Sequence, residues 1–459
     1  MLDSGTDDGV QQRLGEYFER LGAVLGNKQR RASFATYAIG LLGDGERKSM
    51  EPIAARACAS PEQIDAQHQR LGHFIREAQW DDRKVRSEAA RYALEWMTAR
   101  EPIATWILDD TGFLKQGTHS VGVKRQYTGS AGKVTNCQVA ASLSVATRAD
   151  HLGIDFELYL PATWTDDPAR RKEVRIPEDV TFKTKPELAL RMIDRAIEDG
   201  VPKGVVLADE GYGNSSKFRQ ALRARGLEYA VAVSSTTTVW LAYRDGKLSE
   251  LRWSVREIAQ ELKEKQFRQT TWREGTRGLL HARFAVRRVV VGNERGRPPA
   301  KRETQWLLME WRNDEPEPAH FYLLTLPEKT SRKQMVRLVK ERYRTERFYQ
   351  DMKGELGLDH FEGRTFPGWH HHVSVALCCY AFVIAEKLRT FFSTLRRQRG
   401  AGAYAIPTGT PLRGLIHHHP SCDSAPAERL ASSLPALSQR QTILPTPGRP
   451  SPRSPEVTQ

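Results

Sequence analysis

The sequence predicts an α/β protein: a mixed β-sheet with flanking helices, interrupted by a β-rich insertion and preceded by a helical domain. Three observations lead to this prediction. Apolar residues recur at three- and four-residue steps through the first hundred positions, as in amphipathic helices. From Ile103 onward, short apolar runs bounded by turn residues alternate with helical patterns, as in a mixed sheet. A later stretch contains only short strands.

These patterns divide the 459 residues into segments that differ in their expected secondary structure. The predicted segments are a helical domain (1–100), the first part of an α/β core (101–234), a β-rich insertion (235–326), the second part of the core (327–395), and a basic tail rich in Pro and Ser (396–459). The tail has little periodicity, so we expect it to be disordered.

Two short helices are expected inside the helical domain, at residues 50–58 and 62–74. Ser60 can cap the second helix, and Pro61 suits its first position. The pattern fits a helix-turn-helix and an ordinary helical hairpin about equally well. The first alternative would make residues 1–100 a DNA-end-binding domain.

The core is expected to begin with a short strand, Thr105 to Asp110, that ends in two acids and is followed by a glycine-rich loop, Gly112 to Gly132. The loop has no GxxxxGKS pattern, so no ATP site is predicted. The further expected strands are 136–145, 152–160, 204–210, 227–233, 284–291, 306–311 and 321–326, and the further expected helices are 186–199, 214–225, 331–354 and 371–395.

Charge and composition restrict the class of protein. Seventy Lys and Arg against 56 Asp and Glu leave a net charge of +14, which suits a polyanionic partner such as nucleic acid. There is no run of 18 apolar residues and no apolar leader segment, so we expect a cytoplasmic protein without a membrane partner. The cysteines lack CxxC spacing and are expected to be reduced core thiols: Cys58, Cys137, Cys378, Cys379 and Cys422.

Acidic residues end two of the predicted strands, at Asp109-Asp110 and at Asp209-Glu210. Strand ends are where an α/β sheet presents its chemistry. Hard divalent cations prefer oxygen ligands, and two such ions can cleave a phosphodiester. A third acid, Glu346, shares a predicted helix face with Arg342 and Lys353, as a metal ligand beside a DNA phosphate requires. Each acid taken alone is more typical of a solvated surface position, and only the combination of the three favours a metal site.

These residues carry a family resemblance. Arg342-x3-Glu346-x6-Lys353 resembles the Arg-Glu-Lys part of the Tyr-x2-Arg-x3-Glu-x6-Lys signature of DDE insertion-sequence transposases. The segments 107–111 and 206–213 are similar to the two aspartate motifs of that group, and residues 355–372 resemble the run that follows its catalytic glutamate. The resemblance extends over about residues 20–390.

The resemblance implies an RNase H-like core and a transposase that cleaves DNA at terminal inverted repeats and transfers the strand to target DNA. It implies two Mg²⁺ or Mn²⁺ ions held by Asp109, Asp209 and Glu346, and a homodimer in the synaptic complex, associated with the nucleoid. Asp109 is preferred over Asp110 as the first metal ligand because Asp109 and Thr111 match the Asp-x-Thr motif. Asp110 is then expected to contact the ligands without binding the metal itself. The expected DNA contacts are Arg342, Tyr343, Lys353, Lys124 and Arg125.

One departure concerns the signature tyrosine, whose position is occupied by Val339; Tyr343, one turn later, is the alternative phosphate contact. In such proteins the insertion assists the handling of DNA hairpins, so Trp272, Trp306 and Trp311 are either base-stacking residues or core.

The histidines 370–372 are expected to pack beside the active site or touch DNA, and 417–419 are not expected to bind metal. The alternative function is a domesticated, non-catalytic DNA-binding regulator, and a further one is a nuclease that does not transpose.

Overall fold

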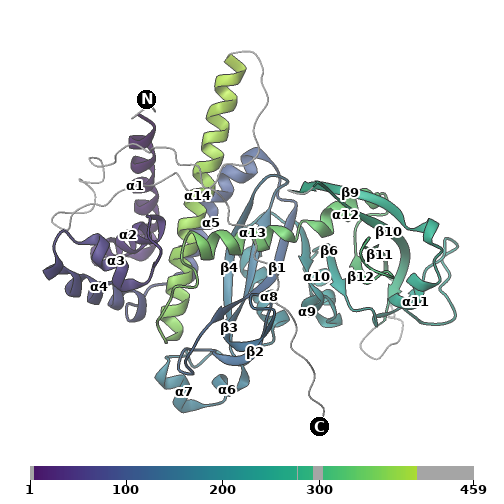
Figure 1. Cartoon of the computed structure of the whole chain (residues 1–459), viewed down its shortest axis with the longest axis horizontal. Coiled ribbons are helices and arrows are strands. Elements are labelled where there is room, and N and C mark those ends of the chain that lie inside the picture. The colour runs from purple at the N-terminus through teal and green to yellow at the C-terminus, as the bar shows by residue number, and fades with distance from the viewer. Residues whose placement is uncertain (1–4, 276–277, 293–302, 401–459) are drawn as a thin grey trace, which may run out of the picture.

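The computed structural model describes residues 5–275, 278–292 and 303–400, and the features below refer to these residues. The helices that precede the sheet are α1 (Gly5–Leu25), α2 (Lys28–Leu42), α3 (Met50–Ala57), α4 (Ile64–Arg76) and α5 (Asp82–Arg100). Helices α1 to α4 lie at one side of the molecule, and the long helix α14 (Phe366–Gly400) lies between them and the strands, with α5 packed beside it (Figure 1). No described helix is long and apolar enough to cross a bilayer.

A twelve-stranded sheet runs through the described residues in the order β2-β3-β1-β5-β6-β12-β11-β10-β7-β8, with β4 on β3 and β9 on β10. The strands are β1 (Thr105–Leu114), β2 (Lys124–Thr128), β3 (Lys133–Ala146), β4 (His151–Tyr159), β5 (Val205–Ala208), β6 (Tyr229–Val233), β7 (Thr238–Leu241), β8 (Trp253–Ser254), β9 (Arg268–Gly275), β10 (Gly278–Val291), β11 (Thr304–Trp311) and β12 (His320–Leu324).

The core strands have RNase H-like topology. β4, β3 and β1 form an antiparallel series, and β5 and β6 continue from β1 in parallel. The predicted α/β class with a mixed sheet is therefore confirmed. The strands that fall in the predicted insertion continue the same sheet, because β12 pairs with β6.

The remaining helices connect or cover these strands. They are α6 (Ala162–Thr165), α7 (Pro168–Glu173), α8 (Lys185–Glu198), α9 (Glu210–Gly213), α10 (Ser216–Ala224), α11 (Val255–Gln260), α12 (Arg332–Lys340) and α13 (Tyr343–Gly354). α8 begins with a complete capping box, in which Thr184 and Glu187 satisfy each other's backbone N–H groups. α13 crosses in front of β4 and β1 (Figure 1).

Several predicted boundaries are wrong, two of them because of strand pairing. β1 does not end at its acids but continues to Leu114, since β3 pairs with it along its whole length. The predicted loop 112–132 contains β2, which pairs with the start of β3. Ser60 makes no side-chain cap; it precedes a 3₁₀ turn at Pro61–Gln63.

The single helix predicted at 331–354 is two helices, because the chain breaks at Glu341 and Arg342, between α12 and α13. α14 begins at Phe366, five residues before the predicted start.

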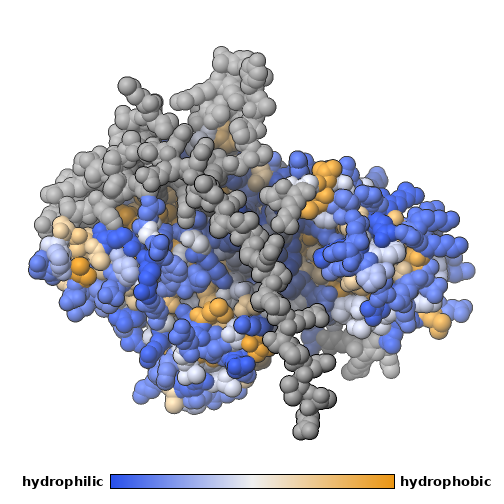
Figure 2. Space-filling view, viewed as in Figure 1, coloured by the Kyte–Doolittle hydropathy of each residue, from blue (hydrophilic) through white to orange (hydrophobic). Residues whose placement is uncertain are grey.

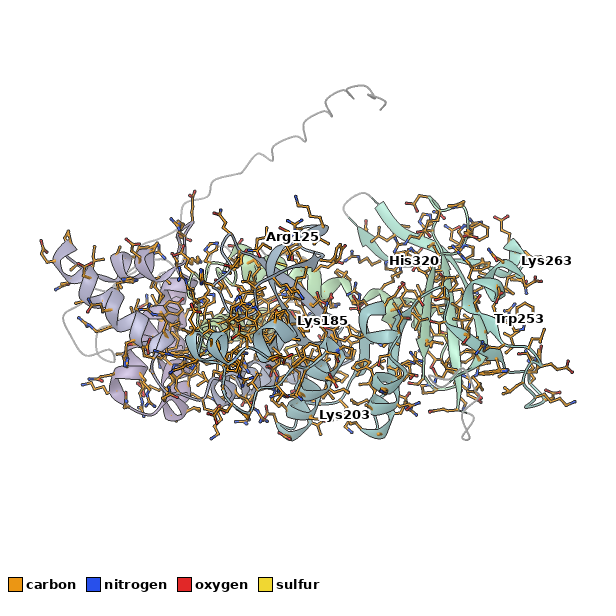
Figure 3. The ribbon with its side chains drawn as sticks, turned by 90° about the horizontal axis from the view of Figure 1, so that it is seen from below. Arg125, Lys185, Lys203, Trp253, Lys263 and His320 are labelled. Atoms are coloured by element: carbon orange, nitrogen blue, oxygen red, sulfur yellow. The ribbon has the colours of Figure 1, made fainter. Side chains whose placement is uncertain are left out.

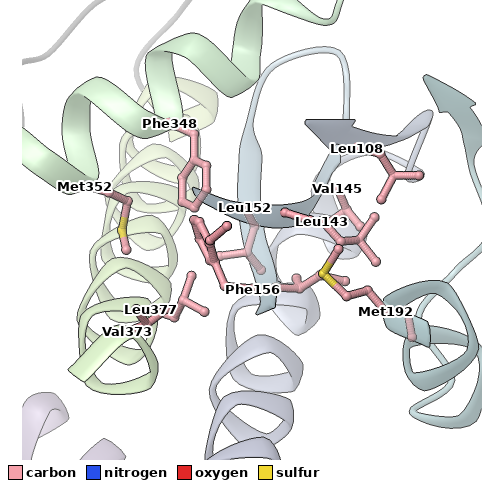
Figure 4. Packing of buried hydrophobic residues seen from close by; sticks show 14 of the residues in the cluster. Leu108, Leu143, Val145, Leu152, Phe156, Met192, Phe348, Met352, Val373 and Leu377 are labelled. Atoms are coloured by element: carbon pink, nitrogen blue, oxygen red, sulfur yellow. The ribbon is translucent and has the colours of Figure 1, made fainter. Parts of the chain in front are cut away.

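The hydrophobic core fixes α13 against the sheet. Phe348 and Met352 of α13 meet Phe156 of β4 and the α14 side chains (Figure 4). Gly153, at a register shift of β4, leaves the space that the Phe348 ring fills; a Cβ there would overlap the ring. Glu346 lies two residues before Phe348, so this packing determines its position.

Candidate active site

The parallel pairing of β1 with β5 brings two of the predicted acids together. Thr105, Trp106 and Ile107 stand opposite Val205, Val206 and Leu207. The same register, continued by two residues, sets Asp109 beside Asp209 on neighbouring strands about 4.8 Å apart. Asp209 directly follows β5 and caps α9, its Oδ1 accepting the N–H of Gly211 at 2.9 Å.

Asp109 has a mostly covered side chain, which is 13% exposed. Its Oδ1 accepts the backbone N–H of Asp110 at 2.9 Å, and its Oδ2 accepts Nη1 of Arg342 at 2.6 Å. Burial raises the pKa of Asp109 to about 7; Arg342 opposes this effect and the negative charge of Asp209 adds to it. Since burial favours the protonated form of Asp109, a positive charge next to its carboxylate is needed to keep it ionised near neutral pH.

Arg342 connects the third acid to the pair. Burial by itself would lower the pKa of Arg342, but Asp109, Asp209 and Glu346 each raise it, and the net shift is upward. All three predicted acids thus act on one guanidinium. Glu346 is exposed, one turn into α13, and lies open to solvent beside the pair.

The side chains of residues 340–344 contact four different parts of the structure: β11, β1, β9 and the turn between β3 and β4. Lys340 binds Glu310 of β11, and Arg342 binds Asp109 of β1. Arg273 of β9 stacks on the ring of Tyr343, with 3.6 Å from guanidinium carbon to ring centroid. Arg344 donates to the backbone carbonyls of Arg148 and Ala149, in the β3–β4 turn. This segment therefore ties the insertion strands to the core strands at the acidic site.

The other predicted DNA contacts are placed as follows. Lys353 donates to the Gly112 carbonyl at 2.7 Å, so its ammonium lies along β1. Lys124 and Arg125 lie exposed on β2. Tyr343 faces the insertion, and Val339, at the signature tyrosine position, is buried in the apolar cluster beneath β10 and β11.

The side chain of Asp110 points to the opposite face of β1 from Asp109, as successive strand residues do. There it binds Lys185, the first residue of α8, at 2.6 Å. Only the backbone of Asp110 contacts Asp109, so this geometry favours Asp109 as the metal-facing acid.

The donor set at the site fits a hard cation, although its present arrangement does not enclose one. Within the described residues, no three His, Cys, Asp or Glu side chains are close enough to hold an ion as they stand. The Arg342 guanidinium instead supplies the positive charge at Asp109 Oδ2. Carboxylate oxygens of Asp109, Asp209 and Glu346 are ligands that Mg²⁺ and Mn²⁺ prefer.

The three tryptophans differ. Trp306 and Trp311 donate their N–H groups to the carbonyls of Leu326 and Glu315, as structural residues do. Trp272 packs edge-on against Phe284, with the Lys340 ammonium 4.7 Å from its ring centroid. Trp272 is thus the one of the three that borders the segment carrying Arg342.

The histidine prediction is wrong in part. His371 stacks on Trp80 and binds the Ile75 carbonyl, while the ring of His372 meets the Tyr37 hydroxyl at 2.9 Å. Both are buried in the joint between α14 and the N-terminal helices, so neither ring is accessible to a ligand from solvent. Trp369, by contrast, packs on Phe113 of β1, beside the site.

Cys137, Cys378 and Cys379 are buried, as expected of core residues, and Cys58 is half-buried. Cys422, the histidines 417–419 and the predicted disordered tail from residue 401 onward lie outside the described residues.

Sequence reasoning missed Lys185, Tyr349 and Ser130. Tyr349, which is partly buried, bonds to the Ser142 hydroxyl at 2.5 Å and lies near Asp109. Ser130 bonds to the Thr111 hydroxyl and to Lys353. The helix-start signal Thr-Lys-Pro-Glu at 184–187 could have marked Lys185 as the first residue of a helix, but not its strand partner.

Two known protein families match overlapping parts of the chain. DDE superfamily endonucleases match residues 20–279, and the transposase DDE domain matches residues 182–382. The chain belongs to the DDE superfamily of endonucleases, in its transposase group, and the resemblance seen in the motifs is confirmed.

Among individual proteins, the probable transposase for insertion sequence element IS701 of Microchaete diplosiphon is 29% identical over 239 residues. The match covers 52% of this chain and 58% of that protein, so it extends over less than two thirds of the relative. A solved piggyBac transposase synaptic complex with hairpin DNA aligns over 83% of this chain and 74% of that one, at 11% identity and a TM-score of 0.40.

Proposed function

We propose that this chain is an active transposase: it cleaves DNA at the ends of a mobile element and joins the freed 3′ end to target DNA. The observation that carries the proposal is the β1–β5 register, whose continuation pairs Asp109 with Asp209, together with the bond from Arg342 to Asp109 just before the helix that carries Glu346. Membership in the transposase group of DDE endonucleases supports it.

In this proposal Asp109, Asp209 and Glu346 hold one or two Mg²⁺ or Mn²⁺ ions. The ions supply activation of a water or 3′-hydroxyl and stabilisation of the leaving oxygen. Arg342 presents a planar guanidinium beside Asp109, which suits two phosphate oxygens at once. In the same proposal, the hydrogen-bonded side chains of Tyr349 and Ser142 cover Asp109 on the side that faces the protein interior and exclude water there.

DNA and a second protomer are the proposed partners. The net charge of +14 provides sequence-independent attraction to DNA. We assign end recognition to the helices within residues 1–100, and contacts near the cleavage point to Lys353, Lys124 and Arg125. Two copies in a synaptic complex would hold both ends of the element.

The proposal is tested by nicking of a plasmid that carries the DNA on either side of this reading frame, with Mg²⁺ or Mn²⁺ added. Asp209→Asn and Glu346→Gln should each lower the nicking rate by about 100-fold or more, since even residues behind metal ligands cost about 10–100-fold. Unchanged binding of the same DNA would locate the loss in cleavage.

Matched controls lie in the loop before α8, where Glu178 and Asp179 are exposed. Glu178→Gln and Asp179→Asn should nick as the parent does. If Asp209→Asn or Glu346→Gln also nicks at the parental rate, the assignment is wrong. A parent that binds the ends without nicking them would favour the non-catalytic regulator.

A further inference from the structure

The hairpin formed by β2 and the start of β3 curls back over β1 beside the acidic site. The buried side chain of Thr128 packs on Gly112, where any Cβ would overlap it. The Ser130 hydroxyl lies 3.2 Å from the Thr111 hydroxyl and accepts the Gly112 N–H at 3.2 Å. The hairpin tip is therefore attached to β1 two and three residues beyond Asp109.

The same tip also contacts the helix that carries Glu346. Nζ of Lys353, in α13, lies 3.3 Å from Ser130 Oγ and 2.7 Å from the Gly112 carbonyl. Strand, hairpin and helix thus meet at one point. Because Thr128 and Ser130 anchor the tip to β1 and α13, its outward side chains are held in place relative to Asp109.

Two large side chains of this tip face solvent. Tyr127 and Val134 stand opposite each other in the hairpin register, and they are 64% and 53% exposed. A cross-strand aromatic–aliphatic pair is normally a packing contact. Here the pair is exposed to solvent and forms a small apolar surface on an anchored hairpin. Apolar surface is visible at this end of the core, over β2 and β3 (Figure 2).

The surroundings of the pair are basic. Lys124, Arg125 and Lys133 are all exposed, and none of them forms an ion pair with an acid among the residues that the structure describes. Arg125 projects from the core part of the molecule, well away from Lys263 and Trp253 in the insertion (Figure 3).

This combination favours DNA over a protein partner. Unpaired cations beside an apolar protein surface would have to be desolvated on docking, whereas phosphates neutralise them and release counterions. Proteins that hold unpaired bases combine basic tracks with aromatic rings on which bases stack. A tyrosine between three free cations has this composition.

We propose that the hairpin tip, residues 127–134, is a DNA wedge: Tyr127, supported by Val134, stacks on a base next to the scissile phosphate, and Arg125 and Lys133 hold the flanking backbone. The position relative to the scissile phosphate rests on the proposed function. The stacking contact itself needs no cleavage.

The test uses full-length protein and a duplex from the DNA flanking the reading frame, with 2-aminopurine placed in turn at each position around the nick mapped with the parent. Ca²⁺ replaces Mg²⁺ so that binding is read without cleavage. Parental protein should change the fluorescence at one position, Tyr127→Ala should abolish the change, and Tyr127→Phe should retain it. In Mg²⁺, Tyr127→Ala should nick about 10-fold more slowly, the loss expected of one stacked base.

Tyr243→Ala is the matched control, since that tyrosine is 54% exposed in the insertion strands, and it should behave as the parent. Arg125→Gln with Lys133→Gln should reduce the slope of log affinity against log salt by about 2. No fluorescence change with the parent, or an equal change with Tyr127→Ala, would overturn the wedge. A parent that gives the stacking signal but never nicks would refute the proposed function and leave the wedge standing.

Discussion

The ion pair between Glu310 and Lys340 offers a sharp test of how the insertion strands hold the acidic site. Glu310 has no exposed surface, and its Oε1 accepts Nζ of Lys340 at 2.5 Å while its Oε2 accepts the Tyr322 hydroxyl at 3.0 Å. Lys340 ends α12, two residues before Arg342. The perturbation is Glu310→Gln, which keeps the shape and removes the charge.

The expected loss follows from the burial of both charges. Desolvation lowers the pKa of Lys340, and the charge and hydrogen bond of Glu310 oppose this effect. The protonated form of Lys340 is therefore stabilised by the Glu310 carboxylate. Leaving one charge of a buried pair without its partner costs about 3–5 kcal/mol. Glu310→Gln together with Lys340→Met removes both charges and should recover most of the loss, because an apolar replacement of a buried pair is often close to neutral.

The assay is urea unfolding followed by tryptophan fluorescence, with the two single variants and the double variant completing a mutant cycle. Glu317→Gln is the control, since its pair with Arg256 is exposed and should be worth less than about 1 kcal/mol. The reasoning is refuted if Glu310→Gln destabilises the protein no more than Glu317→Gln does.

The same pair predicts a pH dependence with a definite sign. Although burial alone would raise it, the pKa of Glu310 is held below its ordinary value of 4.5 by Lys340 and Tyr322. Its contribution is therefore fully present above about pH 4.5 and is lost as the pH falls through the folded pKa. Parent and Glu310→Gln should differ at pH 7 and converge at strongly acid pH.

Two further predictions concern the site and its support. Because the pKa of Asp109 is about 7 and a ligand must be ionised, Mn²⁺ affinity by calorimetry should rise about tenfold per pH unit below 7 and level off above it; a pH-independent affinity would contradict this. Gly153→Ala should destabilise the protein by about 1–3 kcal/mol in thermal unfolding and slow nicking, since it displaces Phe348 and the helix with Glu346. Gly15→Ala, with nothing within 4 Å, should leave stability equal or higher, and equal losses in both variants would count against the packing argument.

The acids could be predicted because local signals surround them. An apolar run before Asp109 and another before Asp209 identify two buried strands, and the spacing of Arg342, Glu346 and Lys353 identifies a basic and acidic helix face. The motif resemblance then supplied the link among the three segments. Nothing local could supply the β1–β5 register, which is a property of strands about a hundred residues apart in the chain.

Other features were inaccessible for the same reason. The partner of Asp110 is Lys185, which belongs to a helix far along the chain, so the pair could not be read from either segment. The break at Glu341 interrupts a good helical pattern because Lys340 binds Glu310 of β11 whereas Arg342 binds Asp109 of β1, a distant strand of the same sheet. The sequence predicts the histidines of α14 to lie beside the active site or to touch DNA, yet His371 and His372 bond to carbonyl and hydroxyl groups of the N-terminal helical region.

The sequence by itself determined the class: a basic α/β chain with strand-terminal acids, a helix that carries the third acid, and motifs that define a transposase family. These properties are encoded over a few residues at a time, as periodicity, spacing and charge. Only the tertiary structure decided which groups face one another: Arg342 on Asp109, Lys185 on Asp110, and the 127–134 hairpin on β1. Such contacts join segments that are far apart in the sequence and meet only in the folded chain. No pattern of neighbouring residues can therefore reveal them.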